Sequence, residues 1–346
     1  MLELNETPIR TCKNFNINNI EIEAILPNKK QEFNNIDIKA ENTILDTNVK
    51  DYKLAFGNGE LVEINNKIIA NHKLRIEENK KGETIEITYD FDDNNLNLIN
   101  NIEIYAKNEI NVIIKYISKT NKPCFHNGIV KAYGKENSKA NITIVNFMNL
   151  ESNNFEAIQS ELEDNASINY CIIDIGAKNS IINNYSDLYG KNTKCDIKTI
   201  YLGTKEQIKD INYIADVKGE KANVNIDVQG ALRDSSKKHF KGTIDFKKGC
   251  KKAKGNESEY CMLLSDKAKS IALPILLCTE EDVEGNHGAA SGKVDEKKLY
   301  YIMSRGIEYK EAVKLIVKAN FNKIISEVKD ESLKEEILNE IDKKLD

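Results

Sequence analysis

The sequence has no tryptophan, only 4 prolines in 346 residues and no long apolar run. The 40% of apolar residues exclude a disordered chain, and 17 glycines are too few for a collagen-like one. No window approaches the roughly 18 apolar residues that a membrane span needs. The N-terminus MLELNETPIR also lacks the apolar segment of a signal peptide. We therefore expect a cytoplasmic protein that does not enter a membrane.

An excess of charge of one sign is also missing. The chain carries 50 Lys+Arg against 55 Asp+Glu, a formal net charge of -5 at pH 7. Lys and Glu alternate along the chain instead of clustering, so no face of single sign is expected. This pattern does not point to nucleic acid or to an anionic membrane as a partner.

Cysteine pairs at metal-binding spacing are absent. The seven cysteines are an odd number, are scattered and form no C-x-x-C motif: Cys12, Cys124, Cys171, Cys195, Cys250, Cys261 and Cys278. This pattern favours reduced thiols over a disulfide framework or a closed zinc site. We expect most of them to be small apolar residues of the core.

A nucleotide-binding loop is missing as well. The stretch Gly285–Lys293 resembles one, but a phosphate-binding loop needs four residues between its glycines and a hydroxyl after the lysine. Here three residues separate Gly288 from Gly292, and Val294 follows Lys293. We therefore expect this chain to bind no nucleotide.

What the chain does contain is β-structure, over residues 36–278. Short stretches alternate apolar and polar residues, which is typical of strands. They begin at Leu61, Thr84, Asn101, Asn141, Ala166 and Ala222. A sandwich, a barrel and a solenoid all fit this alternation. Short strands and Asn-rich turns, which stack in ladders when coils lie above one another, favour a solenoid.

Helical signals begin near Asp295. Asp295 can cap a helix that ends before Gly306, and apolar residues at three- and four-residue spacing predict a second helix over 308–328. A capping box at Ser332–Glu335 predicts the start of a third helix. Since this piece of about 50 residues is too small for a core of its own, it must pack on the β-region or on a partner.

The histidines differ in their surroundings. His72, His126 and His239 lie in Lys- and Asn-rich stretches without a second ligand at motif spacing, so we expect them in turns or on the surface. His287 lies between small residues, where an uncrowded backbone would let the imidazole reach outward. His287 is therefore the candidate for a functional role.

From residue 240 to 312 the sequence resembles the SufB/SufD family, the scaffold-type subunits of the SUF iron–sulfur cluster assembly machinery. An acidic-valine stretch, a small loop with His-Gly-Ala and a helix ending in Arg-Gly occur in the family's order. The matching segments are Phe240–Ile244, Met262–Asp266, Leu273–Leu276, Glu281–Gly292, Leu299–Gly306 and Glu311–Ala312.

The resemblance implies a right-handed parallel β-helix followed by a small α-helical domain. It suggests an N-terminal segment over 1–35, a β-helix core over 36–290 and a C-terminal helical domain over 291–346. It also implies that the helical domain docks the ABC-type ATPase SufC. Residues expected at that contact are Leu299, Tyr300, Met303, Arg305, Leu315 and Ile316. A second SufB/SufD-type subunit, identical or different, and a cysteine desulfurase system are the other implied partners.

For the site, the resemblance implies a non-catalytic scaffold that carries a transient iron–sulfur cluster shared between subunits, while SufC hydrolyses ATP. His287 matches the family's histidine, but Gly288 stands where SufB has Glu. The key SufB cysteine aligns with Glu259, and Cys261 lies two positions further, on the same face of a strand. These departures favour a SufD-like or compact single-scaffold form with incomplete ligation, which suits release of the cluster.

Two other functions remain open. The chain could be a structural adaptor between SufC and a true SufB, binding no cluster itself. Less favoured is a carbohydrate-active β-helix enzyme, because acidic residues abound without a marked pair.

Overall fold

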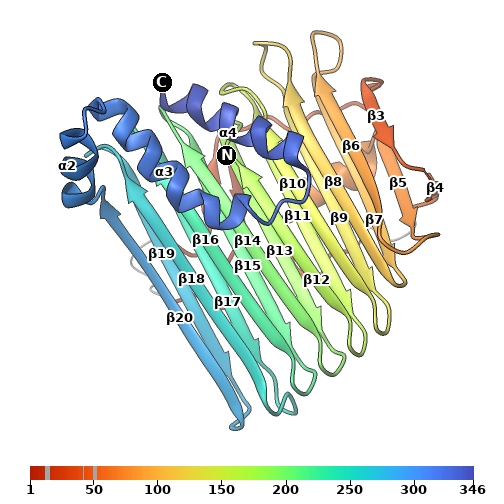
Figure 1. Ribbon diagram of the computed structural model, residues 1–346. Coiled ribbons are helices and arrows are strands. Elements are labelled where there is room, and N and C mark those ends of the chain that lie inside the picture. Colours follow the sequence, from red (N-terminus) through yellow and green to blue (C-terminus); the bar gives the residue numbers. More distant parts are fainter. Residues whose placement is uncertain (12–15, 42, 50–52) are drawn as a thin grey trace.

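Two parallel sheets of nine strands face each other in the computed structural model, which describes residues 1–11, 16–41, 43–49 and 53–346 (Figure 1). From β5 on, the chain passes from one sheet to the other at each turn, so each strand up to β18 pairs with the strand two positions later in the sequence. This arrangement confirms the predicted parallel β-solenoid.

The sheets are named here by their last strands. The β20 sheet contains β3 (Ile36–Lys39), β6 (Glu83–Phe91), β8 (Glu109–Ser118), β10 (Lys139–Phe147), β12 (Ser167–Asp174), β14 (Lys194–Gly203), β16 (Asn223–Leu232), β18 (Ala253–Leu263) and β20 (Val283–Lys293). The β19 sheet contains β4 (Ile44–Asp46), β5 (His72–Glu77), β7 (Asn97–Ala106), β9 (Phe125–Gly134), β11 (Asn153–Leu162), β13 (Asn179–Leu188), β15 (Ile208–Val217), β17 (Lys237–Phe246) and β19 (Lys269–Cys278). Within the described parts of these two sheets, only β3 and β4 join antiparallel.

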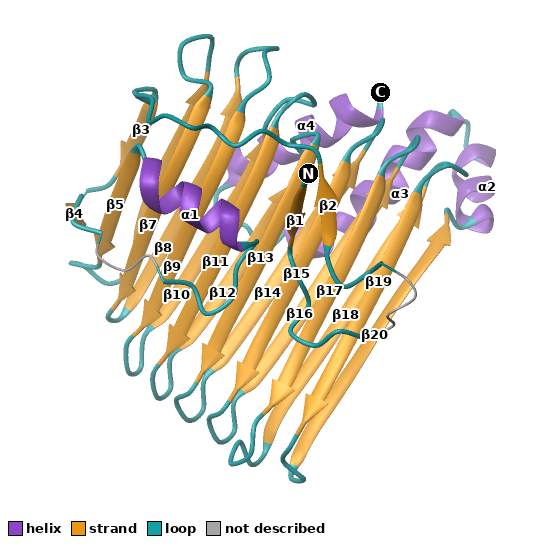
Figure 2. Cartoon of the chain, turned by 180° about the vertical axis from the view of Figure 1, so that it is seen from behind, coloured by secondary structure: helices purple, strands orange, loops and turns teal. Residues whose placement is uncertain are grey.

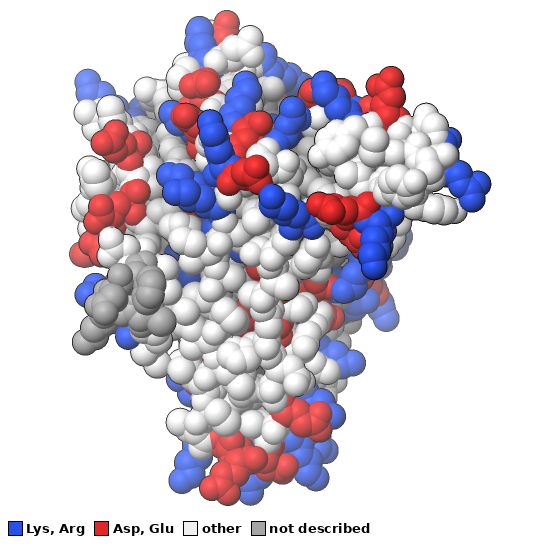
Figure 3. All heavy atoms as spheres, turned by 90° about the vertical axis from the view of Figure 1, so that its left-hand side faces the viewer, with Lys and Arg blue, Asp and Glu red and all other residues white. Residues whose placement is uncertain are grey.

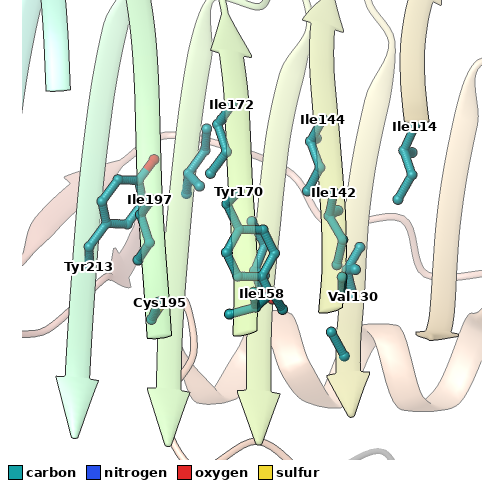
Figure 4. Packing of buried hydrophobic residues seen from close by; sticks show 14 of the residues in the cluster. Ile114, Val130, Ile142, Ile144, Ile158, Tyr170, Ile172, Cys195, Ile197 and Tyr213 are labelled. Carbon is teal, nitrogen blue, oxygen red and sulfur yellow. The ribbon is translucent and has the colours of Figure 1, made fainter. Parts of the chain in front are cut away.

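The main core fills the space between the sheets. Side chains such as Ile142 and Ile197 from the β20 sheet meet Ile158 and Tyr213 from the β19 sheet (Figure 4). Each interior position recurs on the next coil, so like residues stack along the axis. Burial of this apolar column is the main source of the free energy that holds the coils together.

Both sheets are also covered on their outer faces (Figure 2). Helices α3 (Tyr309–Ile325) and α4 (Glu331–Leu345) pack on the β20 sheet and form a second apolar cluster with it. The antiparallel strands β1 (Leu2–Leu4) and β2 (Ile20–Ile22), with helix α1 (Glu60–Ile69), cover the β19 sheet. Most strands are therefore buried on both faces, and they run longer than their visible alternation.

Left-handed backbone conformation recurs at equivalent turns of several successive coils. Asn137, Asn165 and Asn192 have positive φ angles of 61°, 59° and 54°. Asn tolerates this region better than most residues. Their side chains form a ladder, with donor-to-acceptor distances of 3.1 Å across steps of 28 and 27 residues. The predicted stacking of Asn-rich turns is thus confirmed at these turns.

One predicted strand is wrong. Residues 61–65 belong to α1, not to a strand. Val62, Asn66 and Ile69 are its buried residues, at spacings of four and three, as on one face of a helix. Five residues of alternation were too short to distinguish this helical face from a strand.

The three C-terminal helices lie where they were expected, with one wrong cap. Asp295 caps α2 (Glu296–Ser304) by accepting from the backbone of Lys297 and Lys298, and Gly306 follows with φ 88°. Helix α4 begins earlier than predicted, because Asp330 accepts from the Leu333 amide and replaces Ser332 as the cap. Residue 328, expected on the second helix, lies beyond the end of α3.

Over the described ranges, the helices are all too short or too polar to pass through a lipid bilayer.

Candidate functional site

The last coil forms an uncharged end face. Strand β20 pairs with β18 on one side, and no other described strand pairs with its second edge. No charged residue occurs in 270–279 of the last coil or in 285–292 of β20. Figure 3 shows this end of the molecule, with charges gathered toward the turns and the helices and few between them. His287 lies in the middle of β20 and is exposed.

The register between β18 and β20 brings the sequence-predicted residues to the same end of the β-helix. His287 pairs with Glu257, Ala289 with Glu259, and Ser291 with Cys261. Paired residues of a parallel sheet share a face, and here that face is the interior one, where Cys261 joins the core. Only His287 of the three predicted residues is exposed, since Glu259 and Cys261 are 3% and 0% exposed.

Glu259 already has partners. Lys238 Nζ lies 2.8 Å from its Oε1, and both side chains are fully buried. The Tyr201 hydroxyl donates to the same oxygen at 2.7 Å. Buried charges are retained when they are paired and hydrogen-bonded in this way. Glu259 therefore neutralises Lys238 inside the β-helix.

Cys261 is held as a buried thiol. Burial raises the pKa of this thiol, and the nearby Lys238 ammonium and a hydrogen bond with Tyr201 oppose that shift only partly. Because the thiolate is the form that binds metal, the closed interior does not favour ligation by Cys261. Cys12 lies outside the described residues; among the other cysteines, Cys124, Cys195 and Cys250 are also buried and Cys278 is exposed.

Glu257 is a residue that the sequence interpretation missed. Its side chain is 1% exposed, and neither carboxyl oxygen has a hydrogen-bond partner among the described residues. Burial, with a contribution from Glu259, raises its pKa to about 8. A Cβ added at Gly242 would lie well under 3.0 Å from this carboxyl group. The absence of a side chain at Gly242 therefore leaves room for the Glu257 carboxyl group. The sequence could have indicated Glu257, because it lies two residues before Glu259 and therefore on the same face of the strand.

A complete metal centre is not present in the part of the chain that the structure describes, since no three His, Cys, Asp or Glu side chains gather there in a way that could hold an ion. At position 288 the glycine leaves open space, with nothing within 4 Å of an added Cβ. The register thus places the exposed His287 beside Glu257, and Glu257, Glu259 and Cys261 all lie in the interior along β18.

Next to this end face, the C-terminal helices present an apolar surface. Tyr300, Met303 and Leu315 are 76%, 41% and 43% exposed, and Arg305 is also exposed. Arg305 lies over the Tyr301 ring at 5.2 Å. The two other residues predicted for partner contact, 299 and 316, are half-buried. A groove of about 990 Å³ separates α2 from α3 and the β20 sheet and is lined by Tyr260, Met262, Tyr301, Ile302, Leu315 and Ile316.

The prediction that His126 lies in a turn or on the surface is wrong. His126 is on β9 and fully buried, 2.6 Å from Asn154 Oδ1 and 2.8 Å from Asn100 Oδ1. Burial lowers its pKa to about 4 and raises that of Glu156, 3.9 Å away, to about 8. Both groups are therefore neutral near pH 7, and polar neighbours from adjacent coils take the place of solvent.

The same prediction fails for the other two histidines. His72 lies on β5, half-buried, with its Nδ1 2.8 Å from the Tyr89 hydroxyl, and burial lowers its pKa to about 4. His239 lies on β17, also half-buried, 3.5 Å from Asp210. Lys and Asn neighbours in the sequence do not indicate an exposed position here. On a strand, the adjacent residues point to the opposite face, and the Asn side chains form ladders between coils.

These features define a β-helix scaffold with an open, imidazole-bearing end and no complete centre of its own among the described residues. Residues 89–320 match the family described as SUF system FeS cluster assembly, SufBD core domain. The chain belongs to this family of SufB- and SufD-type proteins.

Among its relatives, the iron–sulfur cluster assembly protein SufD of Bacillus subtilis is 29% identical over 279 residues, which cover 79% of this chain and 63% of that protein. An iron–sulfur cluster assembly SufBD family protein of Pyrococcus horikoshii is 28% identical over 203 residues, 59% of this chain and 45% of that protein. SufD of Escherichia coli is 24% identical over 163 residues, which cover 47% of this chain and 38% of that protein. The chain thus spans less than two thirds of each of these relatives.

Proposed function

We propose that this chain is a SufD-like scaffold subunit for iron–sulfur cluster assembly. The observation that carries the proposal is the exposed His287 at the centre of the unpaired edge of strand β20. An imidazole is a ligand for iron and for clusters, and an edge strand is a ready surface for a second chain. In this function the cluster is cargo, which is built and then released.

The β20 edge supports a second SufB/SufD-type subunit as partner, identical or different. An 11-residue strand offers a row of backbone donors and acceptors, and residues 285–292 place no charge there to prevent pairing. Pairing along this edge would cover His287 with a second chain, which could supply the missing ligands. Incomplete ligation by each chain suits a cluster that must be passed on.

The helical surface supports docking of a SufC-type ATPase. Helix α2 has no buried residue and presents tyrosine and methionine side chains to solvent. Exposed aromatic and apolar residues of this kind are typical of interfaces. Since β20 ends at Lys293 and α2 begins at Glu296, a pull on α2 would be transmitted directly to the strand that carries His287. ATP binding by SufC would then open the end face for iron and for sulfide from a cysteine desulfurase.

The test is cluster accumulation on the complex of this chain with its partners. His287→Ala should abolish bound iron and sulfide while SufC still copurifies. Asn286→Ala is the matched control, because it changes the preceding residue on the same strand, whose side chain points to the opposite face. Undiminished iron and sulfide in His287→Ala would reject the ligand role.

The adaptor alternative has one observation in its favour, the lack of a three-ligand site in the described residues. Leu315→Asp should disconnect SufC, because it puts a charge into the exposed apolar surface. Leu61→Asp is its control, a similarly exposed leucine on α1 behind the opposite sheet. If Leu315→Asp removes SufC while His287→Ala leaves the cluster intact, the chain is an adaptor.

A further inference from the structure

We propose that Glu257 acts with His287 as a carboxylate–imidazole pair that binds one divalent first-row metal ion at the open end of the β-helix. The inference rests on the proposed function, in which that ion is ferrous iron on its way into a cluster. It assigns the oxygen ligand to Glu257 and not to Glu259, the carboxylate that the family resemblance favoured.

Position is the first reason. Glu257 and His287 are direct register partners on adjacent parallel strands, so their side chains leave the same face of the sheet at one strand spacing. Strands in a sheet lie about 4.8 Å apart, a span that a metal ion between an imidazole and a carboxylate can bridge. Glu259 and Cys261 pair instead with Ala289 and Ser291, which offer no nitrogen or carboxylate ligand.

Availability is the second reason. Both oxygens of Glu257 lack hydrogen-bond partners in the described chain, whereas Glu259 shares one oxygen with Lys238 and Tyr201. A buried carboxyl group without any partner is rare and is retained for a reason. Lys238 is already paired with Glu259, so no resident cation of the described chain occupies Glu257, and an incoming ion would displace the proton that burial keeps on this carboxyl group.

Access is the third reason. Only β20 separates Glu257 from the end face, and around His287 this strand consists of small residues. Ala289, the next residue that shares the face of His287, carries only a methyl group. An ion could therefore reach Glu257 through a rearrangement of one exposed imidazole. The mixed nitrogen and oxygen donors suit a borderline divalent ion, and two protein ligands leave coordination positions open for sulfide and for a second subunit.

The test uses Co²⁺ as the probe, titrated by its visible absorption into the purified full chain without oxygen or partners. The wild-type chain should bind one Co²⁺. Glu257→Gln and His287→Ala should each weaken that binding by at least about tenfold, as expected when a metal site loses an essential group. The double variant should weaken binding by less than the product of the two single effects, because both residues serve one ion.

Glu156→Gln is the matched control, because Glu156 is another buried carboxyl group whose oxygens lack hydrogen-bond partners in the described chain, but on β11 in the interior. It should leave Co²⁺ affinity unchanged. If Glu257→Gln fails to fold, Glu257→Asp keeps the carboxylate and should retain binding closer to wild type than His287→Ala does. Wild-type affinity in Glu257→Gln, or no Co²⁺ binding by the wild-type chain, overturns the inference. Loss of iron and sulfide in His287→Ala complexes would still support the scaffold function in either case.

Discussion

Gly230 is the position where one methyl group should do the most damage next to the proposed site. A Cβ there would lie well under 3.0 Å from three ring carbons of Tyr201, which crosses over this glycine to reach Glu259. Overpacking of a core costs about 1–3 kcal/mol. Displacing the Tyr201 hydroxyl from the Glu259 carboxylate costs about 1.5–3 kcal/mol more. We therefore expect Gly230→Ala to lower the free energy of unfolding by about 2.5–6 kcal/mol.

The assay is urea unfolding followed by far-ultraviolet circular dichroism, since the chain has no tryptophan for fluorescence. Gly292→Ala is the control, because an added Cβ there meets nothing within 4 Å. A double-variant cycle adds Tyr201→Ala, which removes the ring that the new methyl group meets. In that background Gly230→Ala should cost little. An equal cost with and without the ring, or a cost as small as that of Gly292→Ala, would refute the reasoning.

Three further predictions concern the turns, the N-terminal segment and the interior. Asn165→Ala should lower the free energy of unfolding by about 1–2 kcal/mol, because alanine is strained in the left-handed region, and by about 1 kcal/mol more, because the ladder hydrogen bonds are lost. Asn165→Gly should lose only the contribution of the ladder. Urea unfolding midpoints distinguish the two variants, and equal losses would contradict the backbone contribution. Asn5 donates to Asp210 at 2.7 Å, so Asn5→Ala should speed hydrogen exchange of β1 and β2, and unchanged exchange would show that this bond does not hold them. Glu156 keeps its proton to about pH 8 when folded but loses it near the ordinary glutamate pKa of 4.5 when unfolded, so wild-type stability should fall as pH rises through this window. At about 1.4 kcal/mol per pKa unit, this loss of folding free energy amounts to a few kcal/mol. Glu156→Gln should therefore reduce the dependence of the melting temperature on pH. An unchanged pH dependence would show that other groups cause it.

The sequence predicted those parts of the fold that depend on local chemistry. Asp295 and Gly306 bound a helix whatever surrounds it, because the cap and the left-handed turn involve neighbouring residues only. Alternation revealed the strands only where one face meets solvent. It was hidden on β9, β11, β13 and β15, which are buried on both faces, and it misled at 61–65, where a helix lies on the sheet.

The residues of the candidate site also differ in whether the sequence could reveal them. His287 could be found because its motif is contiguous in the sequence. Glu257 could not, because its importance comes from pairing with a residue 30 positions later, and coils of unequal length hide that register. His126 shows the converse, since its polar sequence neighbours gave no sign that Asn100 and Asn154, each one coil away, enclose it.

The last coil has a neighbour on one side only. In a solenoid, stability is nearly a sum of contributions from adjacent coils, so the terminal repeat should open more readily than those inside. Fraying of β19 and β20 would expose Glu257 and Cys261 without unfolding the rest. A second subunit bound to this end would then stabilise the terminal coil in its folded form. Its dissociation would again allow the terminal coil to open locally, and the cargo could leave.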